Sequence, residues 1–220
     1  MQSAEVLHLA ELLCSRLCHD LTSPIGAVKS GLELIAEFGD EPDGQAMTLI
    51  GDSAEGAAAK LRFFRIAFGL SGATQSELSL EDAAEMAAPV VTSRRVRLDW
   101  PTRPDGSGRQ PVSDGLKALL NVVLLAVEAL PRGGEVQVRL APAAGKLDAT
   151  VLAAAPDARL VDEMRAAVRG EVPIRNLTAR TVQGYFTWLV VDRLGSDLII
   201  EDERGVGILF RIEIPLQPAT

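Results

Sequence analysis

The sequence is poor in cysteine, in aromatic residues and in positive charge. Only two of its 220 residues are cysteines, 4% are aromatic, and the formal net charge is −8. Proteins that hold nucleic acid or an anionic membrane surface without sequence specificity need clustered lysine and arginine. The charge balance excludes that kind of binding, and we expect neither a nucleic-acid partner nor a membrane partner.

Long apolar runs and targeting signals are also lacking. The longest apolar run, residues 119–130, is interrupted by Asn121 and Glu128 and is shorter than the roughly 20 residues that span a bilayer. Residues 1–5 contain no basic residue, so the start of the chain does not resemble a signal peptide. These absences predict a cytoplasmic protein.

The two cysteines, Cys14 and Cys18, lie one helical turn apart. That spacing rarely permits a disulfide, and two thiols supply too few ligands for a metal ion. We expect both cysteines to be reduced and to lie on the core side of a helix, and we expect no metal site.

A segment from Val6 to Phe38 repeats apolar residues at helical spacing around the stretch Cys-His-Asp-Leu-Thr-Ser-Pro at residues 18–24. At about 100° per residue, His19 lies opposite the apolar side. The apolar side comprises Val6, Ala10, Leu17, Leu21, Ile25, Val28, Leu32 and Ile35. The His19 side carries Ser15, Arg16, Thr22, Ser23, Gly26, Ser30, Glu33 and Glu37. The pattern predicts a buried apolar stripe and an outward-facing histidine that a partner can approach; an exposed histidine without a chemical role fits it equally well.

Two neighbours suggest that this histidine is reactive. A neutral imidazole attacks phosphorus through Nε2 only when Nδ1 holds the proton, and an adjacent carboxylate such as that of Asp20 fixes this tautomer. Pro24 removes a helical hydrogen bond to the carbonyl of Asp20, so we expect a kinked but continuous helix. His8 lies on nearly the same face, but no acidic residue follows it and no proline lies five residues on. His19 is therefore the favoured reactive histidine.

The string His-Asp-Leu-Thr-Ser-Pro at residues 19–24 resembles the H-box of two-component dimerisation and phosphotransfer domains. Residues 17–34, together with Arg-Phe-Phe-Arg-Ile-Ala-Phe-Gly at 62–69, resemble the ChpT family of alphaproteobacterial histidine phosphotransferases. This resemblance implies that His19, assisted by Asp20, takes a phosphoryl group from the aspartate of one receiver domain and passes it to another. The receiver supplies the Mg²⁺, so no cofactor is expected on this chain.

The resemblance also implies the partners. They are the receiver of a CckA-like hybrid histidine kinase and the response regulators CtrA-like and CpdR-like, in cell-cycle control. Arg16, Thr22, Ser23 and Gly26 would frame the histidine against the receiver. Ser23 occupies the position that related kinases link to phosphatase activity, so a weak dephosphorylating role is possible.

A second helical pattern runs from Met47 to Phe68 after a turn cluster at residues 39–44. The two helices should form an antiparallel hairpin that brings Lys60, Arg62 and Arg65 near His19, where they would meet an acidic receiver; a solvated basic helix end is an equal alternative. Two amphipathic helices cannot bury a wide apolar face alone. We therefore expect a homodimer whose two hairpins form a four-helix bundle with outward-facing histidines.

Residues 71–76 have the composition of a linker, so we predict a hairpin domain at 1–72 and a second domain at 77–220. The pattern beyond the linker is typical of an α+β fold, here an α/β sandwich. Its expected elements are helices over 80–91, 112–130, 157–169 and 178–193, and strands over 96–100, 135–140, 147–152, 197–201 and 208–214.

Residues 119–135 and 205–210 resemble the ATP-binding domain of sensor histidine kinases. The magnesium-binding asparagine of that family is replaced by Leu125, its Asp-x-Gly-x-Gly by residues 153–157, and its glycine-rich lid by residues 183–186. Phosphates need glycines and Mg²⁺ needs a hard oxygen ligand, so we predict a degenerate sandwich that binds no nucleotide. Asn121 and Glu128 are predicted to lie on an exposed polar face, and Gly133-Gly134 to form a tight turn.

The sequence is compatible with three functions. The leading hypothesis is a histidine phosphotransferase that shuttles a phosphoryl group through His19 without ATP. The alternatives are a fragment of an ATP-dependent sensor-type histidine kinase and a non-catalytic dimeric scaffold for receivers.

Overall fold

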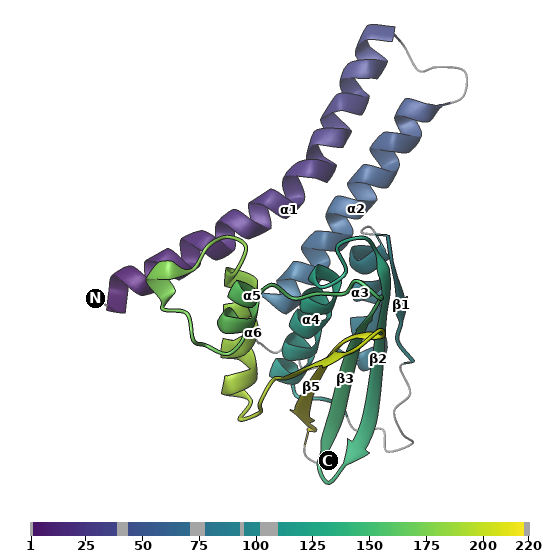
Figure 1. Ribbon diagram of the computed structural model, residues 1–220. Helices are drawn as coiled ribbons and strands as arrows, with labels where there is room; N and C mark the ends of the chain where they lie inside the picture. Colours follow the sequence, from purple (N-terminus) through teal and green to yellow (C-terminus); the bar gives the residue numbers. More distant parts are fainter. Residues whose placement is uncertain (1, 39–43, 71–77, 93–94, 102–109, 218–220) are drawn as a thin grey trace.

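The computed structural model describes the chain except for residues 1, 39–43, 71–77, 93–94, 102–109 and 218–220. Two long helices, α1 (Gln2–Phe38) and α2 (Gln45–Ala67), form the predicted antiparallel hairpin, which rises away from the rest of the molecule (Figure 1). The predicted linker and most of the predicted hairpin turn lie outside the described residues. The division into two domains at 72–77 therefore stays a prediction.

Helix α1 continues through Pro24 and changes direction near its middle (Figure 1), as the proline predicts. Its first half lies over the α/β part, where Leu9 and Leu12 pack against Leu177 and Tyr185. Its second half pairs with α2. Gly31 lies at this pairing: a Cβ placed there would lie 2.6 Å from Cγ1 of Ile50.

The remaining elements form the α/β part of the molecule. They are α3 (Leu80–Thr92), β1 (Val96–Asp99), α4 (Ser113–Glu128), β2 (Gly134–Ala143), β3 (Lys146–Ala154), α5 (Asp162–Ala167), the 3₁₀ turn η2 (Ile174–Asn176), α6 (Val182–Arg193), β4 (Ile199–Glu203) and β5 (Gly207–Pro215). The five strands have the order β1-β2-β3-β5-β4. The β1–β2 pair is parallel and the other pairs are antiparallel. The predicted α+β class is confirmed.

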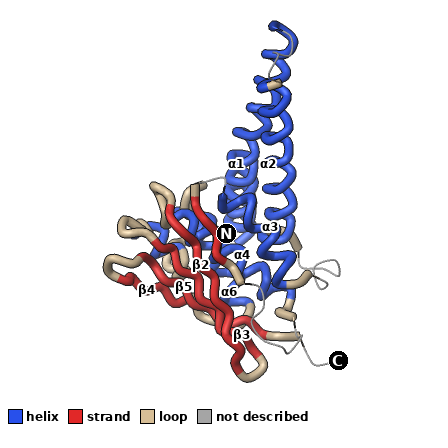
Figure 2. Tube along the Cα trace, turned by 90° about the vertical axis from the view of Figure 1, so that its right-hand side faces the viewer, coloured by secondary structure: helices blue, strands red, loops and turns tan. Residues whose placement is uncertain are grey.

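Helix α4 is the centre of the packing. It contacts β3 and β5 of the sheet as well as α6, α3 and α2, so it lies between the sheet and the base of the hairpin (Figure 2). Leu119, Leu120 and Leu125 are fully buried. A helix that is apolar on nearly every side requires this kind of enclosure. Because α4 contacts α2 directly, the α/β part holds the hairpin in a defined place.

Several elements begin later than the sequence predicts. The helix expected from residue 157 begins at 162, because the backbone N–H of Arg159 donates to the carbonyl of Ala129 at 2.9 Å instead of to a helical partner. The helix expected from residue 178 begins at 182, because the backbone N–H groups of Thr178 and Thr181 each donate to the other's hydroxyl. The tight turn at Gly133-Gly134 is confirmed, with positive φ at both residues.

Two predictions about exposure are wrong. Cys14 and Cys18 are free but exposed, because nothing in the described part of the chain covers their side of α1. Asn121 is fully buried instead of exposed, because the base of α2 covers that side of α4. The apolar stripe of α1 is buried in part within one chain: Leu17 and Leu21 pack on the core, while Val6, Ile25 and Leu32 are exposed. Among the described residues, no helix has both the length and the apolar character needed to cross a membrane.

Candidate active site

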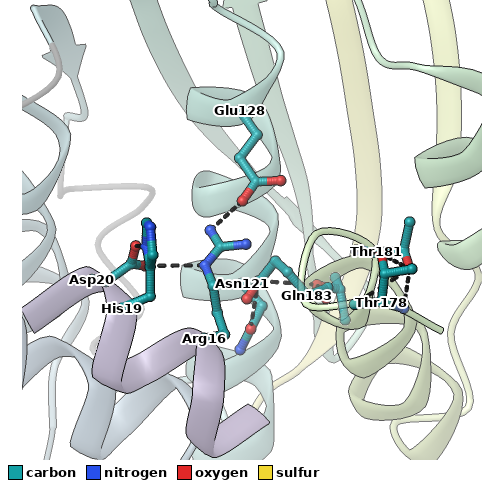
Figure 3. Close-up of polar contacts among 9 residues, drawn as sticks. Arg16, His19, Asp20, Asn121, Glu128, Thr178, Thr181 and Gln183 are labelled. Atoms are coloured by element: carbon teal, nitrogen blue, oxygen red, sulfur yellow. Dashed lines mark hydrogen bonds and ion pairs between the residues drawn. The ribbon is translucent and has the colours of Figure 1, made fainter. Parts of the chain in front are cut away.

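His19 lies exposed on the polar face of α1. Its side chain is 85% exposed, whereas that of the adjacent Asp20 is 13% exposed. Nδ1 of His19 lies 3.4 Å from Oδ1 of Asp20, a long contact in which Nδ1 is the ring nitrogen that faces the carboxylate. Figure 3 shows the two side chains next to each other on α1. The predicted pairing of an outward-facing imidazole with the adjacent carboxylate is present in the structure, and the shielding of that carboxylate is an addition that the sequence did not predict.

Arg16 holds the other oxygen of Asp20. Its Nε donates to Oδ2 of Asp20 at 3.1 Å, and its terminal nitrogen donates to Oε1 of Glu128, at the end of α4 (Figure 3). Burial by itself would lower the pKa of Arg16, but the charges and hydrogen bonds of Glu128 and Asp20 outweigh it and hold the pKa above its ordinary value. Arg16 was predicted to frame the histidine against a partner; in the structure it joins two carboxylates from two elements.

Lys60 lies at the kink in α1. Its Nζ donates to the backbone carbonyl of Asp20 at 3.1 Å. This is the carbonyl that loses its helical hydrogen bond to the missing N–H of Pro24. Lys60 of α2 therefore replaces the hydrogen bond that Pro24 of α1 cannot make. The same contact joins the kinked region of α1 to α2.

The other two predicted cations lie differently. Arg62 donates to Glu55 of its own helix at 3.2 Å, and Arg65 is exposed in the last turn of α2. Of these predicted cations, Lys60 contacts the helix that carries His19, and Arg62 instead pairs with a residue of α2.

Thr22, Ser23 and Gly26 lie exposed on α1 beyond the histidine. The hydroxyl of Thr22 donates to the carbonyl of Cys18 at 2.8 Å, so its hydrogen is used within the helix. A Cβ on Gly26 would meet no atom within 4 Å. This face is exposed and carries only small side chains, so the backbone of a second protein can approach it closely.

A cleft of about 690 Å³ separates His19 from the α/β part. Its α1 wall includes Arg16, His19 and Asp20, and its opposite wall includes Arg159 and Arg180. Sequence reasoning missed these two arginines, because they lie in irregular segments whose position depends on the fold. It assigned Glu128 to an exposed face, although a lone carboxylate at the end of an apolar helix was a signal that it has a partner.

The positions that would serve a nucleotide in the kinase-like domain are occupied by other interactions. Leu125 is fully buried in the core. The amide of Asn121 donates to the carbonyls of Ala67 and Lys117, at 2.7 and 2.8 Å, and its oxygen accepts from Nε2 of Gln183 at 3.0 Å (Figure 3). Asn121 thus caps the end of α2 and ties it to α6. Within the described residues, no three His, Cys, Asp or Glu side chains are grouped so that they could share a metal ion.

A family model, a named relative and one solved structure indicate the same family. Residues 80–205 match the family described as histidine phosphotransferase C-terminal domain. The protein phosphotransferase ChpT of Brucella abortus (strain 2308) is 34% identical over 194 residues, which are 88% of this chain and 90% of that protein. A solved bacterial phosphotransferase is 33% identical with a TM-score of 0.78, over 94% of this chain and 96% of that one. The histidine kinase domain of a blue-light activated kinase from Erythrobacter litoralis is 15% identical with a TM-score of 0.48, over 97% and 93% of the two chains.

Proposed function

Because this chain belongs to the histidine phosphotransferase family, whose members act in two-component signalling, we propose that His19 is the residue that carries the phosphoryl group. The observation that supports this assignment is the 85% exposed imidazole of His19 beside the shielded carboxylate of Asp20. The sequence has two histidines, and the other, His8, is partly buried, with its Nε2 shielded from water.

The transfer is a displacement at phosphorus. Nε2 of His19 attacks the phosphoryl group of an aspartyl phosphate on a receiver domain, a nitrogen–phosphorus bond forms, and the receiver's carboxylate leaves with the electrons of the broken oxygen–phosphorus bond. The proton on Nδ1 stays on the ring, which becomes cationic, and Asp20 stabilises that charge. The reverse reaction with a second receiver passes the group on. Charge on the phosphoryl oxygens would be neutralised by Mg²⁺ that the receiver, and not this chain, would hold.

The receiver would dock on the open face of α1 and across the rim of the cleft. Thr22, Ser23 and Gly26 give close approach to His19, and Arg159 and Arg180 place positive charge opposite it. An acidic receiver that carries a phosphoryl group complements this charge. The resemblance to the ChpT family supports a CckA-like kinase receiver as donor and CtrA-like and CpdR-like regulators as acceptors.

The reaction proposed here uses no ATP on this chain. Two observations support that part of the proposal: Leu125 offers no oxygen to Mg²⁺, and the amide of Asn121 is engaged with α2 and Gln183.

We also propose that two copies pair through their hairpins. Apolar side chains remain exposed along the upper part of α1 and α2, among them Ile25 at 56%, Leu32 at 55% and Met47 at 55%. A second hairpin would bury them in a four-helix bundle and leave His19 on the outside.

The test is phosphotransfer from a pre-phosphorylated receiver domain, without ATP, to the wild-type chain, to His19→Ala and to His8→Ala. We expect acid-labile label on the wild type and on His8→Ala, and none on His19→Ala. Equal labelling of His19→Ala would disprove the assignment. Labelling of the wild type only when Mg-ATP replaces the phosphorylated receiver would identify the chain as a kinase.

A further inference from the structure

Glu128 is a carboxylate in an unfavourable position. It is the last residue of α4, where the negative end of the helix dipole disfavours a second negative charge, and its side chain is only 17% exposed. A carboxylate that is shielded from water needs a charged or hydrogen-bonding partner. Its partner here is Arg16, which belongs to α1 and lies 112 residues away in the sequence.

The Arg16 guanidinium bridges two carboxylates. One nitrogen donates to Glu128 and another, Nε, donates to Oδ2 of Asp20 at 3.1 Å. The guanidinium is planar and presents its donors in a fixed fork, so the position of one carboxylate sets the direction of the donor that faces the other. Oδ2 of Asp20 is thereby held, and Oδ1 is left to face Nδ1 of His19 at 3.4 Å.

We propose that Glu128 is a positioning residue for His19: through Arg16 it fixes the carboxylate of Asp20 so that the neutral imidazole keeps its proton on Nδ1. This inference rests on the proposed role of His19. It gives the α/β part a role other than nucleotide binding: Glu128, at the end of α4, determines the tautomer of His19 on the hairpin. Figure 3 shows the four side chains in the order of their contacts, from Glu128 on α4 through Arg16 and Asp20 to His19 on α1.

The exposure of His19 makes the inference testable without a receiver. Because 85% of the His19 side chain is in water, Asp20 is the main neighbouring group that can favour one neutral tautomer of the ring over the other. The populations of the two tautomers are read from the ¹⁵N chemical shifts of the neutral ring. A variant that only lowers stability, and leaves the folded molecules unchanged, does not move these shifts.

The experiment compares the wild type with Glu128→Gln, Arg16→Lys and Asp20→Asn, with Glu135→Gln as the matched control. Glu135 is paired with an arginine in the same part of the molecule, Arg97, at 2.9 Å, and it contacts no residue of the site. Arg16→Lys keeps the charge, but a single ammonium has no fixed fork with which to orient both carboxylates. We expect Glu128→Gln and Arg16→Lys to move the His19 tautomers toward those of Asp20→Asn. We also expect them to slow single-turnover transfer about tenfold, the low end of the effect that loss of a hydrogen-bonded partner behind a histidine ligand has at metal sites. Glu135→Gln should match the wild type in both measurements.

The order of action is tested by combining variants. If Glu128 acts through Asp20, Glu128→Gln should cause no further loss of rate in an Asp20→Asn background. An equal loss in both backgrounds would mean that Glu128 acts on structure alone. Wild-type tautomers in Glu128→Gln would also overturn the inference, and if that variant does not fold, Arg16→Lys decides by the same readout. These results are separable from the proposed function, which is disproved only if His19→Ala accepts the phosphoryl group.

Discussion

At the scale of single residues, the site separates two requirements that one side chain cannot meet together. The nucleophile must be accessible to a second protein, and His19 is exposed; the group that orients it must be shielded from water, and Asp20 is mostly buried. An ion pair is stronger where water is excluded, so the contacts of Asp20 with Arg16 orient it better than an exposed pair would. The reactive ring of His19 is exposed, and Asp20 and Arg16, which orient it, are mostly buried.

The contact between Lys60 and the carbonyl of Asp20 leads to a prediction about stability. Lys60→Met should lower the free energy of unfolding by about 1–2 kcal/mol, because the carbonyl freed by Pro24 loses a charged donor. In a Pro24→Ala background the new backbone N–H at position 24 can bond that carbonyl, so the same substitution should cost less. Urea denaturation of the four proteins measures both costs. Equal costs in the two backgrounds would show that Lys60 does not compensate the proline.

The residues nearest to the chemistry were predictable from the sequence, and their supports were not. His19, Asp20 and Pro24 lie within six positions, so helical geometry and local chemistry identify them. Glu128 reaches the site only because the fold brings the end of α4 within hydrogen-bonding distance of Arg16 on α1, and no local pattern encodes a contact across 112 residues. For Asn121 the same limit produced an error, since a polar residue on a helix indicates exposure unless a buried hydrogen-bond partner is known.

At the scale of elements, the hairpin depends on how closely α1 and α2 approach each other. Gly31 is buried at their contact, and Gly26, five residues earlier, is exposed. Both lie in the middle of the same helix, where glycine is intrinsically unfavourable. The sequence alone does not distinguish them, because the difference comes from the position of Ile50 on the other helix.

The same substitution at these two glycines should have opposite effects. Gly26→Ala should raise the free energy of unfolding by about 0.5–1 kcal/mol, because alanine favours the helix and its Cβ meets no atom within 4 Å. Gly31→Ala should lower the melting temperature, because its Cβ would lie 2.6 Å from Cγ1 of Ile50. Calorimetric melting of both variants is the measurement. A gain of stability in both would mean that the helices are not in close contact at Gly31.

Helix α3 begins with a reciprocal cap that depends on pH. The backbone N–H and hydroxyl of Ser79 donate to Asp82, at 2.8 and 2.7 Å, and these bonds lower the pKa of Asp82, the backbone bond most. A lowered pKa means that the unfolded chain binds the proton more tightly. The stabilisation is therefore present above the pKa of the unfolded state, near 4, and is lost as pH falls through the lowered value.

Asp82→Asn should consequently reduce stability at neutral pH and have little effect in acid. We expect a loss of about 0.5 kcal/mol at pH 7, in the range for an exposed charge at a helix N-terminus, and a smaller difference at pH 2. Glu85→Gln in the same helix is the control. Urea denaturation at the two pH values measures the change, and an equal loss at both would contradict the assigned cap.

At the scale of the whole molecule, the base of the hairpin and the α/β part share one core. Phe63 and Phe64 of α2 belong to the same buried cluster as Leu116 and Leu119 of α4. The predicted fold class and nearly all of the predicted elements are confirmed, but this shared core was not foreseen, because helical periodicity shows which face is apolar and not what covers it. Removal of residues 77–220 would expose the two phenylalanines.

The exposed apolar residues on the upper hairpin should pair with a second copy. Leu32→Glu should shift the protein toward monomer and raise the dimer dissociation constant more than about tenfold, since a two-fold interface contains each substitution twice. Val206→Glu, at an exposed position in the α/β part, is the control. Sedimentation velocity distinguishes the species. A wild-type chain that sediments as a monomer at micromolar concentrations would contradict the dimer.

The decisive measurement is the location of the phosphoryl group by ³¹P and ¹⁵N NMR after transfer from a phosphorylated receiver without ATP. We expect a single nitrogen–phosphorus bond, at Nε2 of His19, because Nδ1 faces Asp20 and holds the proton in the proposed tautomer. A phosphoryl group on Nδ1 of His19, or on His8, would contradict this assignment.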